Sequence, residues 1–330
     1  MKILYGIQGT GNGHISRGKF IYKLLQKYSS NIDVLISGNN YSLKPNMPIK
    51  YFNKGITFAI TNGKIDYLKT LSNFDLYTSY LEQKEIPFKE YDLIITDFEP
   101  ITAWSSVRYN IPSIHISHQA SFIDQSVPRP KSKNLLGEYV MKYFCPTNDY
   151  IGIHYKQYGD NISEPIILDH IASATTSVKD YVTVYLPWYQ DDYLYNFFKE
   201  FKDLKFHIFS KHTDVVNKLN NCVFYPINEI SFSKSVRNSY GVIANAGFQT
   251  TSEVLFLGKR LLAIPVKGQY EQTCNAEALK QLGVSCLSDL KLDSKKDILH
   301  WLESSPVQIK FQNSLEKLFC KKIKSLIKDF

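Results

Sequence analysis

The sequence predicts an α/β protein with two doubly wound, Rossmann-like domains that face a cleft, and with a helix that closes the C-terminus. Three observations support this prediction. Apolar runs of strand length alternate with stretches of helical period, as in a parallel sheet covered by helices on both faces. The alternation starts afresh near residue 181. A length of 330 residues suits about two domains, at roughly 150 residues per domain.

The first series of alternating segments begins at the N-terminus. Each predicted strand in it is an apolar run that stops at glycine or at a polar residue. The series consists of the strand 1–7, the helix 15–28, and the strands 32–37, 91–96 and 111–117.

The second series repeats the same pattern after a stretch, 160–179, that lacks strong periodicity. Its strands are predicted at 181–186, 205–210, 223–226, 241–244 and 260–265, and its helices at 192–202, 250–257 and 272–282. We therefore expect an N-terminal domain over 1–168 and a second domain over 178–305.

The tail from 306 to 330 forms the third predicted unit. Its apolar residues recur at helical spacing between 308 and 330, which predicts a closing helix that packs back toward the N-terminal domain. These residues are Phe311, Leu315, Leu318, Phe319, Ile323 and Leu326.

Composition excludes several classes of protein. With 44% hydrophobic and 21% charged residues, the chain is neither disordered nor fibrous. Its five cysteines lie far apart without a CxxC pair, so we expect reduced thiols, a cytoplasmic location and no metal site. The apolar start is too short for a signal sequence. No window supplies about 18 uninterrupted apolar residues, so any membrane contact is expected to be peripheral.

The chain has a net charge of +8, from 39 basic and 31 acidic residues. This charge indicates an anionic partner but does not indicate which class of partner it is. Nucleic acid, an anionic membrane surface and a phosphorylated substrate all suit it. The basic residues are spread along the chain and no nucleic-acid-binding motif is present, so we expect no nucleic-acid partner.

A glycine-rich loop, Gly9 to Gly13, joins the first strand to the first helix. Its glycines allow backbone N–H groups to approach an anionic ligand at the helix N-terminus. The GxGxG spacing is not the GxGxxG of dinucleotide-binding proteins, and Gly38 stands where the ribose-binding acid is expected. His14 follows directly. It is a candidate general base, although capping or packing of the helix start is the more frequent role for such a histidine.

Polar side chains also follow two later strands. Asp97 and Glu99 come after the strand 91–96, at the edge where doubly wound sheets keep their sites. One of them is a candidate to orient His14, and an equally good alternative makes Asp97 a helix cap with Glu99 in the first turn. His118 follows the strand 111–117. His115 and His118 face opposite sides of an extended strand, so a shared metal is not expected.

The segment NAGFQTTSE, 245–253, joins a short apolar strand to a helix through small residues. Thr250, Thr251 and the free N–H groups can bond phosphate oxygens, and Glu253 can accept hydrogen bonds from both hydroxyls of a ribose. A capped helix without a ligand is an equally good interpretation of this segment alone.

About twenty residues later, a strand again leads into a polar helix start. Glu271 and Gln272 stand side by side there, and Asn275 lies one turn further. Carboxylates accept hydrogen bonds whereas carboxamides both donate and accept, so this set suits sugar hydroxyls. An ordinary polar helix start is the alternative.

Taken together, these motifs resemble glycosyltransferases of the two-domain GT-B fold. The likeness is to family 28, which includes the peptidoglycan N-acetylglucosaminyltransferase, and to poorly characterised bacterial and archaeal relatives. It rests on the GxGxGHxxR start, the DFEP segment at 97–100, NAGFQTTSE, and the segment from Pro265 to Ala276. Residues 41–90 are not matched.

The resemblance implies roles for individual residues. A nucleotide-sugar donor, a UDP-sugar in our prediction, is held mainly by the second domain: Glu253 lies on the ribose, the turn 247–251 near the diphosphate, and Glu271 and Gln272 on the sugar. The acceptor faces the first domain, and neither a metal nor another cofactor is required. The donor-binding set is Asn245, Gly247, Phe248, Gln249, Thr250, Thr251, Glu253, Glu271, Gln272 and Asn275. The catalytic set is His14, Asp97 and Glu99, and the acceptor or phosphate loop is Gly11, Asn12, Gly13, Arg17 and His118.

We therefore predict a hexosyltransferase that moves a sugar to a hydroxyl of a glycan or lipid-linked acceptor, as in polysaccharide or cell-envelope biosynthesis. Two alternatives stay open: a UDP-sugar hydrolase or 2-epimerase on the same scaffold, and a non-catalytic nucleotide-sugar-binding protein. The lysines at 321–328, and Lys131 and Lys133 beside Arg129, are candidates for peripheral contact with the inner face of the cell membrane. Solvated helix faces are the more common use of such lysines.

Overall fold

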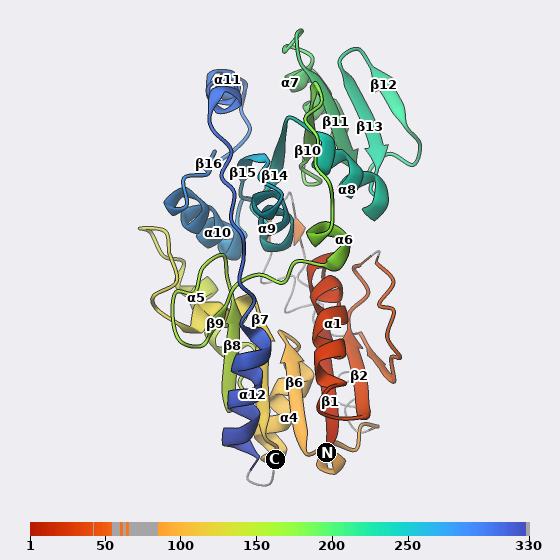
Figure 1. The fold of residues 1–330 in the computed structure, drawn as a ribbon, viewed down its shortest axis with the longest axis vertical. Coiled ribbons are helices and arrows are strands. Elements are labelled where there is room, and N and C mark those ends of the chain that lie inside the picture. The colour runs from red at the N-terminus through yellow and green to blue at the C-terminus, as the bar shows by residue number, and fades with distance from the viewer. Residues whose placement is uncertain (42, 55–59, 62–63, 66–84, 328–330) are drawn as a thin grey trace.

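A computed structural model describes residues 1–41, 43–54, 60–61, 64–65 and 85–327. Two seven-stranded sheets lie one above the other along the long axis, each with helices beside it (Figure 1). Parallel pairing dominates both sheets, so the predicted α/β class with two doubly wound halves is confirmed. A short antiparallel pair, β4 (Ile60–Thr61) and β5 (Lys64–Ile65), stands apart from them.

The N-terminal sheet has the strand order β3-β2-β1-β6-β7-β8-β9 and is parallel throughout. Its central strands are almost wholly buried, which explains their continuous apolar sequence. The strands are β1 (Lys2–Gln8), β2 (Asn31–Ser37), β3 (Tyr51–Asn53), β6 (Leu93–Asp97), β7 (Ser113–Ser117), β8 (Asp149–Ile153) and β9 (Ile162–Ser163).

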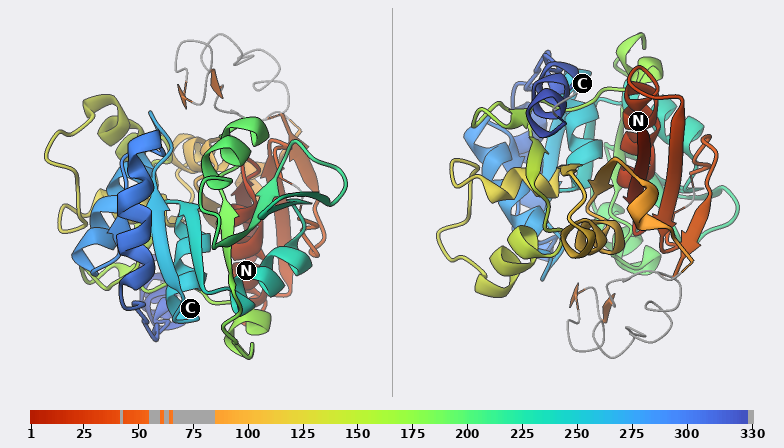
Figure 2. Two further views of the ribbon diagram at one scale, coloured as in Figure 1. Left: turned by 90° about the horizontal axis from the view of Figure 1, so that it is seen from above. Right: turned by 90° about the horizontal axis from the view of Figure 1, so that it is seen from below.

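Helices cover both faces of this sheet. In the view from below, α1 (Asn12–Leu25) and α12 (Leu315–Leu326) lie on one face, and α4 (Pro100–Tyr109) and α5 (Leu135–Tyr143) on the other (Figure 2). The alternation of side chains along β1 matches this arrangement, because Tyr5 joins the cluster under α1 whereas Leu4 joins the cluster under α4. Short helical turns η1 (Phe88–Glu90), η2 (Gln119–Ile123) and α6 (Asp169–Ala172) complete this half.

The C-terminal sheet has the order β12-β13-β11-β10-β14-β15-β16, in which only β12 is antiparallel to its neighbour. Its strands are β10 (Tyr181–Tyr185), β11 (Lys205–Ser210), β12 (Asn217–Leu219), β13 (Cys222–Pro226), β14 (Gly241–Asn245), β15 (Arg260–Ile264) and β16 (Ser285–Cys286). Its helices are α7 (Asp191–Phe198), α8 (Glu229–Asn238), α9 (Phe248–Phe256), α10 (Tyr270–Gln281), η3 (Leu292–Ser294) and α11 (Lys295–Glu303).

Each sheet has a point where the strand order reverses, and ligands of open α/β sheets bind outside the carboxyl ends of strands at such points. In the N-terminal sheet it lies between β1 and β6, and in the C-terminal sheet between β10 and β14. The glycine loop follows β1, Asp97 ends β6, and Asn245 ends β14. The predicted site residues therefore stand at the expected edges of both sheets.

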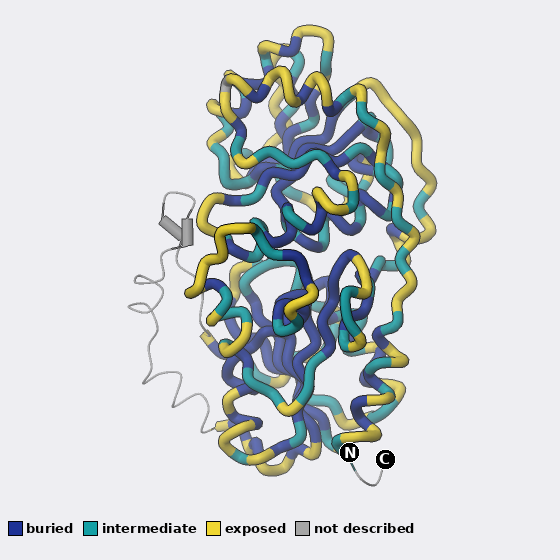
Figure 3. Tube along the Cα trace, turned by 90° about the vertical axis from the view of Figure 1, so that its left-hand side faces the viewer, coloured by how far each residue is buried: buried dark blue, intermediate teal, exposed yellow. Residues whose placement is uncertain are grey.

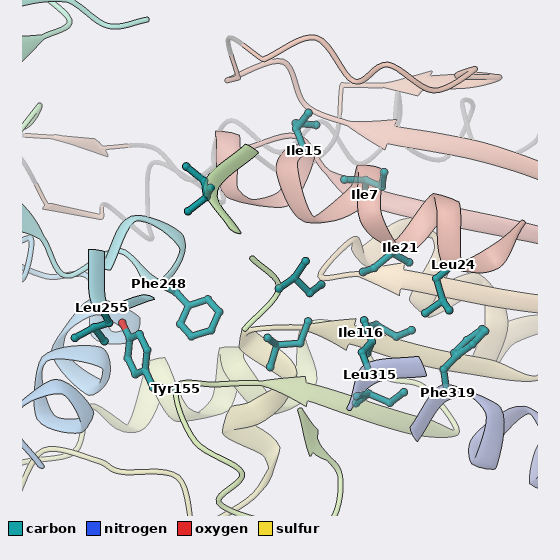
Figure 4. Packing of buried hydrophobic residues seen from close by; sticks show 14 of the residues in the cluster. Ile7, Ile15, Ile21, Leu24, Ile116, Tyr155, Phe248, Leu255, Leu315 and Phe319 are labelled. Carbon is teal, nitrogen blue, oxygen red and sulfur yellow. The ribbon is translucent and has the colours of Figure 1, made fainter. Parts of the chain in front are cut away.

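One buried apolar cluster continues from the N-terminal half into the C-terminal half. Phe248 and Leu255 of α9 pack near Tyr155, which follows β8, while Leu315 and Phe319 of α12 join the same cluster near Ile116 of β7 (Figure 4). Buried segments accordingly run through the middle of both halves in the tube view (Figure 3). The two halves share a core rather than meeting only through polar side chains.

The closing helix is shorter than predicted. It spans Leu315–Leu326 rather than 308–330, although residues 328–330 lie outside the described part of the chain. Its apolar residues contact the N-terminal half, where Phe319 packs edge-on against Tyr28 with ring centroids 5.2 Å apart. Lys322 adds an ion pair with Asp149 of β8. No helix in the described ranges is long and apolar enough to cross a membrane.

Several elements were missed or misplaced by sequence reasoning. The helix predicted at 192–202 ends at Phe198, and the strand predicted at 111–117 begins at Ser113. Strands β8 and β9, and helices α5, α8 and α11, were not predicted, and a helix after Asp97, which α4 is, was only one of two alternatives. Polar residues mask their apolar pattern: α8, for example, buries only Ser235 and Val236.

The glycine-rich loop after β1 contains Gly9, Gly11 and Gly13. Of these, we expect Gly9 to be the one whose substitution destabilises the fold most. A Cβ there would overlap the backbone carbonyl of Gly38, whereas nothing lies within 4 Å of a Cβ on Gly11, whose φ of 177° any residue adopts. We expect Gly9→Ala to lower the free energy of unfolding by about 1–3 kcal/mol. Gly11→Ala is the matched control and should change it by less than about 1 kcal/mol in urea denaturation. Equal effects of the two variants would contradict this account of the loop.

Candidate active site

A pocket between the two halves contains three of the predicted donor residues, Gln249, Thr250 and Glu253. Asn12, Gly13 and Ser16 of α1 form one wall, and Gln249, Thr250 and Glu253 of α9 form another. The remaining lining residues come from the loop after β2, the connection around α6, the end of β10, and the segment from the end of β13 into α8: Leu43, Leu168, His170, Ile171, Tyr185, Ile227, Asn228, Glu229, Phe232 and Ser233. The pocket therefore lies at the carboxyl ends of strands from both sheets.

Two helix N-termini face each other across this pocket. A Cβ on Gly13 of α1 would lie 3.8 Å from the Cβ of Gln249 of α9. The residues before these helices, Gly11 and Gly247, provide no side-chain cap, and neither helix has an acid in its first turn. Nothing lies within 4 Å of a Cβ on either glycine. Both helices thus present uncapped N–H groups and a positive dipole end, the arrangement that binds phosphate.

Glu253 lies one turn further into α9 and lines the same pocket. Its Oε1 accepts a hydrogen bond of 2.7 Å from Nε2 of Gln249. Burial raises the pKa of the Glu253 carboxyl to about 7. A largely buried carboxylate with spare acceptor capacity can receive two hydroxyl groups, so its position suits the predicted ribose contact.

Thr250, Gln249 and Gly247 thus remain in the candidate donor site, but two neighbours do not. The hydroxyl of Thr251 is buried, 2.7 Å from the hydroxyl of Tyr155 and 2.8 Å from the carbonyl of Gly247. Phe248 stacks on His118 at a centroid distance of 3.9 Å. These contacts tie the two halves together, so we correct the assignment of Thr251 and Phe248 from donor binding to packing between the halves.

Asn245 ends β14 beside this turn and is buried. Its Nδ2 donates to the carbonyl of Ile264, which fixes the orientation of the amide. Its Oδ1 has no hydrogen-bond partner within the described part of the chain. Asn245 therefore retains one acceptor at the predicted donor turn.

His14, Arg17 and Asp97 form a compact polar cluster on the N-terminal side of the cleft. Nδ1 of His14 lies 2.9 Å from Oδ1 of Asp97. Arg17 donates to both oxygens of Asp97, from Nε at 2.9 Å and from Nη2 at 2.6 Å. Asp97 is fully buried and Arg17 nearly so, whereas His14 keeps a tenth of its surface exposed. Burial alone would raise the pKa of Asp97, but the charge of Arg17 and the interaction with His14 hold it below its ordinary value.

Two groups compete for Nδ1 of His14 in this cluster. Nη2 of Arg17 lies 2.9 Å from Nδ1 of His14 but only 2.6 Å from Oδ1 of Asp97. Asp97 is ionised, so a proton on Nδ1 of His14 has a strong acceptor there. That tautomer leaves Nε2 of His14 unprotonated, which is the state a general base requires.

Two predicted site residues have other roles in this cluster. Arg17 does not reach out to a phosphate, because its guanidinium pairs with Asp97. Glu99, rather than Asp97, is the N-cap of α4: its carboxylate accepts from the backbone N–H groups of Ile101 and Thr102 at 2.9 and 2.7 Å. The hydroxyl of Ser37 donates to it as well. Glu99 is wholly buried, so we correct its assignment from catalysis to helix capping.

The backbone between these two acids is strained. Phe98 has a φ of 55°, a left-handed conformation that is rare for a bulky residue. Its ring is held by Phe144, at a centroid distance of 4.9 Å, and by His115 at 5.9 Å. The turn lets Asp97 bond Arg17 and His14 while Glu99 caps α4. Strain of this kind concentrates at functional sites.

His118 contacts the C-terminal half instead of forming part of a phosphate loop. Its Nε2 lies 2.8 Å from Oδ1 of Asn275, and its Nδ1 lies 2.8 Å from the carbonyl of Ile153. The amide of Asn275 is oriented by a further bond to the carbonyl of Ala246. Asn275 is fully buried, so both residues position the two halves rather than lining open space.

The two predicted sugar-binding residues differ: the side chain of Glu271 is accessible, whereas that of Gln272 is hydrogen-bonded within its own loop. Glu271 keeps about a quarter of its surface exposed, and its Oε2 accepts 2.9 Å from Nε2 of Gln119. Gln272 accepts from the backbone N–H of Val266 and donates to Gln269, so its amide stabilises its own loop. Glu271 remains available to a ligand and Gln272 does not.

Sequence reasoning missed residues that meet across the cleft. Gln119 and Tyr155 acquire their roles from Glu271 and Thr251, which are distant in sequence. Asn228 lines the pocket two residues after β13 and caps α8, so its place near the carboxyl end of a strand was an available indication. In the described ranges, no group of three or more His, Cys, Asp or Glu side chains is arranged to hold a metal ion.

The raised pKa of Glu253 predicts a pH-dependent stability. A carboxyl that binds protons more tightly in the folded than in the unfolded state stabilises the fold below its ordinary pKa of 4.5. This contribution is lost as pH rises through about 7. At pH 8 we expect Glu253→Gln to raise the free energy of unfolding, by at most about 3 kcal/mol. Glu277→Gln is the control on the surface of α10. Urea denaturation of both variants at pH 5 and pH 8 checks this, and a gain that is equal at the two pH values would contradict it.

The architecture is that of the GT-B glycosyltransferases, and comparisons with known proteins agree. The family model described as glycosyl transferase family 1 matches residues 1–306. The chain therefore belongs to glycosyl transferase family 1 and is a glycosyltransferase. A search of curated protein sequences found no match.

Solved structures with the same fold are distant in sequence. MurG of Acinetobacter baumannii superimposes with a TM-score of 0.54 at 13% identity, covering 100% of this chain and 95% of its own. UGT89C1 of Arabidopsis thaliana, complexed with UDP, has a TM-score of 0.59 at 13% identity, with coverages of 98% and 94%. The spinosyn rhamnosyltransferase SpnG, complexed with spinosyn aglycone, also has a TM-score of 0.59 at 13% identity, with coverages of 99% and 97%. The predicted resemblance to GT-B glycosyltransferases is confirmed.

Proposed function

We propose that this glycosyltransferase moves a sugar from a UDP-sugar to a hydroxyl group of a glycan or lipid-linked acceptor. The observation that carries the proposal is the pair of uncapped helix N-termini, of α1 and α9, on the two sides of one pocket. The adjoining carboxylate of Glu253 and the His14–Asp97 pair supply a ribose contact and a base. A place in cell-envelope biosynthesis in the cytoplasm is part of this proposal.

The donor in this proposal lies along α9. Its ribose contacts Glu253, its diphosphate lies at the N–H groups after Gly247 with the hydroxyl of Thr250, and its sugar extends toward Glu271. Uracil is our choice of base, and it lies among the pocket residues at the end of β13. Two converging dipoles stabilise the negative charge that develops on the departing diphosphate, so the mechanism we propose uses neither a metal nor another cofactor.

His14 acts as the base in this proposal. Its Nε2 takes the proton of the acceptor hydroxyl while the acceptor oxygen forms a bond to the anomeric carbon. The bond from that carbon to the diphosphate breaks, and the electron pair leaves with UDP. Asp97 holds the Nδ1 proton and stabilises the imidazolium that results, and Arg17 keeps Asp97 ionised.

Product analysis with the purified chain tests this function. A panel of nucleotide-sugars is incubated with and without lipid-linked and glycan acceptors, in buffer with and without EDTA. We expect UDP release to depend on an acceptor and to be unaffected by EDTA. Rapid stoichiometric release of free sugar, or of a 2-epimer, without an acceptor would replace the proposal with a hydrolase or epimerase. Binding of UDP-sugars without turnover of any acceptor would support a non-catalytic binding protein.

A thermal-shift screen identifies the nucleotide independently of the acceptor. A ligand that binds only the native state raises the melting temperature by mass action. We expect UDP and several UDP-sugars to raise it. Stabilisation by another nucleotide alone would overturn the choice of uracil and leave the family assignment intact.

A further inference from the structure

Helix α5 and the residues just before it carry large side chains that nothing in the described structure covers. Leu135 is 81% exposed and Tyr139 is 63% exposed, while Leu136 and Tyr143 are each nearly half exposed. Tyr139 and Tyr143 are one helical turn apart, with ring centroids at 4.8 Å. Single exposed apolar residues are ordinary, but four on a nine-residue helix form a patch that indicates a binding surface.

The charge around this patch has one sign. Lys131, Lys133 and Lys142 are all exposed. Between residues 125 and 148 the sequence holds a single acid, Glu138. Glu138 accepts from Arg129 at 2.7 Å and from the hydroxyl of Tyr270 at 2.5 Å, so its charge is engaged on the inner side of the helix. The patch therefore presents apolar and aromatic side chains flanked by positive charge.

The opposite side of α5 is fixed to the protein. Val140 and Phe144 pack in a cluster with Phe98 and Cys145. A Cβ on Gly137 would overlap the ring of Tyr270, so the helix meets α10 at close range. Asn134 caps the helix by accepting from the N–H of Gly137 at 2.9 Å. The exposed side chains are thus presented from a firmly packed helix.

We propose that this α5 surface, formed by Lys131, Lys133, Leu135, Leu136, Tyr139, Lys142 and Tyr143, docks on the surface of an anionic lipid bilayer. Leucine side chains can enter the region between head groups and acyl chains, where tyrosine rings are favoured as well. Lysines beside them interact with anionic head groups. The patch matches this partner in both respects, because its apolar centre lies on α5 and its positive charge lies on α5 and in the residues just before it.

Helix α12 offers no such surface, although its lysines were an equal candidate in the sequence. Leu315, Phe319 and Ile323 on its apolar side are fully buried in the core. Lys322 is engaged with Asp149. Its exposed Lys321 and Lys324 have charge without apolar side chains that could enter a bilayer, which makes α12 a control for charge alone.

The docking surface is directly connected to the cleft. Tyr270, which bonds Glu138 of α5, immediately precedes Glu271, and both begin α10. A bilayer bound at α5 thus lies beside the helix that approaches the donor sugar in our proposal. This connection rests on the proposed function, whereas lipid binding itself is measured without any sugar transfer.

Vesicle flotation of the full chain tests the surface. The vesicles contain phosphatidylcholine alone, or an equal mixture with phosphatidylglycerol. We expect binding to the anionic vesicles only. Leu135→Ser with Tyr139→Ser should weaken it by about tenfold or more, because the apolar contact is lost. Lys131→Glu with Lys133→Glu should weaken it by at least about twentyfold, at about fivefold per lysine.

Two matched variants serve as controls. Val215→Ser with Val216→Ser removes an equally exposed apolar pair from the C-terminal half, and Lys321→Glu with Lys324→Glu reverses the same charge on α12. Both should bind anionic vesicles within about twofold of the unaltered chain. Thermal denaturation of every variant confirms that folding is retained.

Three results would overturn the proposal: no flotation of the unaltered chain with anionic vesicles, equal losses in the α12 and α5 charge variants, or undiminished binding by both α5 variants. A dimer in sedimentation that the Leu135→Ser and Tyr139→Ser changes convert to a monomer would also overturn it, because a second copy of the chain would then be the partner. Acceptor-dependent UDP release in the α5 variants, assayed with a water-soluble acceptor, shows separately whether the proposed function holds.

Discussion

His14→Ala lowers the turnover of sugar transfer by about 10²–10⁴-fold and leaves the affinity for UDP unchanged within about twofold. The physical reason is the division of roles within the cleft. His14 is held by Asp97 on the N-terminal side, whereas the proposed contacts to UDP come mainly from α9. Single-turnover kinetics with a UDP-sugar and an acceptor, combined with calorimetric titration of UDP, measure the two quantities separately.

His300→Ala is the matched control for this variant, because His300 is exposed on α11 and far from the cleft in sequence and fold. It should leave both quantities unchanged. Full turnover in His14→Ala would contradict the assignment of the base. Loss of UDP affinity equal to the loss of turnover would instead make His14 a donor ligand.

Asp97→Asn is expected to lower both turnover and stability. The neutral amide no longer favours the Nδ1 proton of His14, and the buried Arg17 loses its counter-charge. Removing one partner of a buried ion pair typically costs about 3–5 kcal/mol. We expect a loss of that order in urea denaturation, together with a fall in turnover comparable to that of His14→Ala.

A double variant separates the structural from the chemical role of this pair. Arg17→Met with Asp97→Leu replaces both buried charges by apolar side chains, an exchange that often leaves stability unchanged or increases it. Stability should recover relative to Asp97→Asn, while turnover should stay low because His14 has no acceptor for its Nδ1 proton. Recovery of turnover along with stability would show that Asp97 serves folding alone.

The alternation of strands and helices made the fold predictable from sequence. Buried parallel strands such as β1 and β14 are mostly apolar runs, and a run of this kind carries its own signal. The same pattern also located the site. Because β1 and β6 are neighbours in a parallel sheet, His14 in the helix after β1 and Asp97 at the end of β6 had to meet at one edge.

Roles that depend on the other half of the chain were not predictable. Thr251 and His118 looked like ligands because polar residues at such turns bind phosphates or substrates. In the structure each is satisfied by a residue more than ninety positions away, Tyr155 and Asn275 respectively. Local patterns contain no information about such contacts.

Glu99 illustrates a second limit. The sequence placed Asp97 and Glu99 near each other at the right edge, and left open whether the pair serves the site or whether Asp97 caps a helix with Glu99 in its first turn. The left-handed turn at Phe98 decides it, since this turn places Glu99 at the start of α4 and leaves Asp97 for Arg17 and His14. A positive φ at phenylalanine has no sequence signature, so the sequence alone could not show that Glu99 is the cap rather than Asp97.

Calorimetric titration of UDP into the unaltered chain and into Glu253→Gln, at pH 6 and pH 8, tests most directly the claim that the cleft binds a nucleotide-sugar donor. If the ionised carboxylate accepts both ribose hydroxyls, binding by the unaltered chain must be weaker at pH 6, because protonation of a group with a pKa of about 7 competes with UDP. The account predicts micromolar binding at pH 8, a loss of about tenfold or more in Glu253→Gln, and no pH dependence from this group in the variant. Equal UDP affinities in the two proteins at both pH values would contradict the placement of the donor on α9.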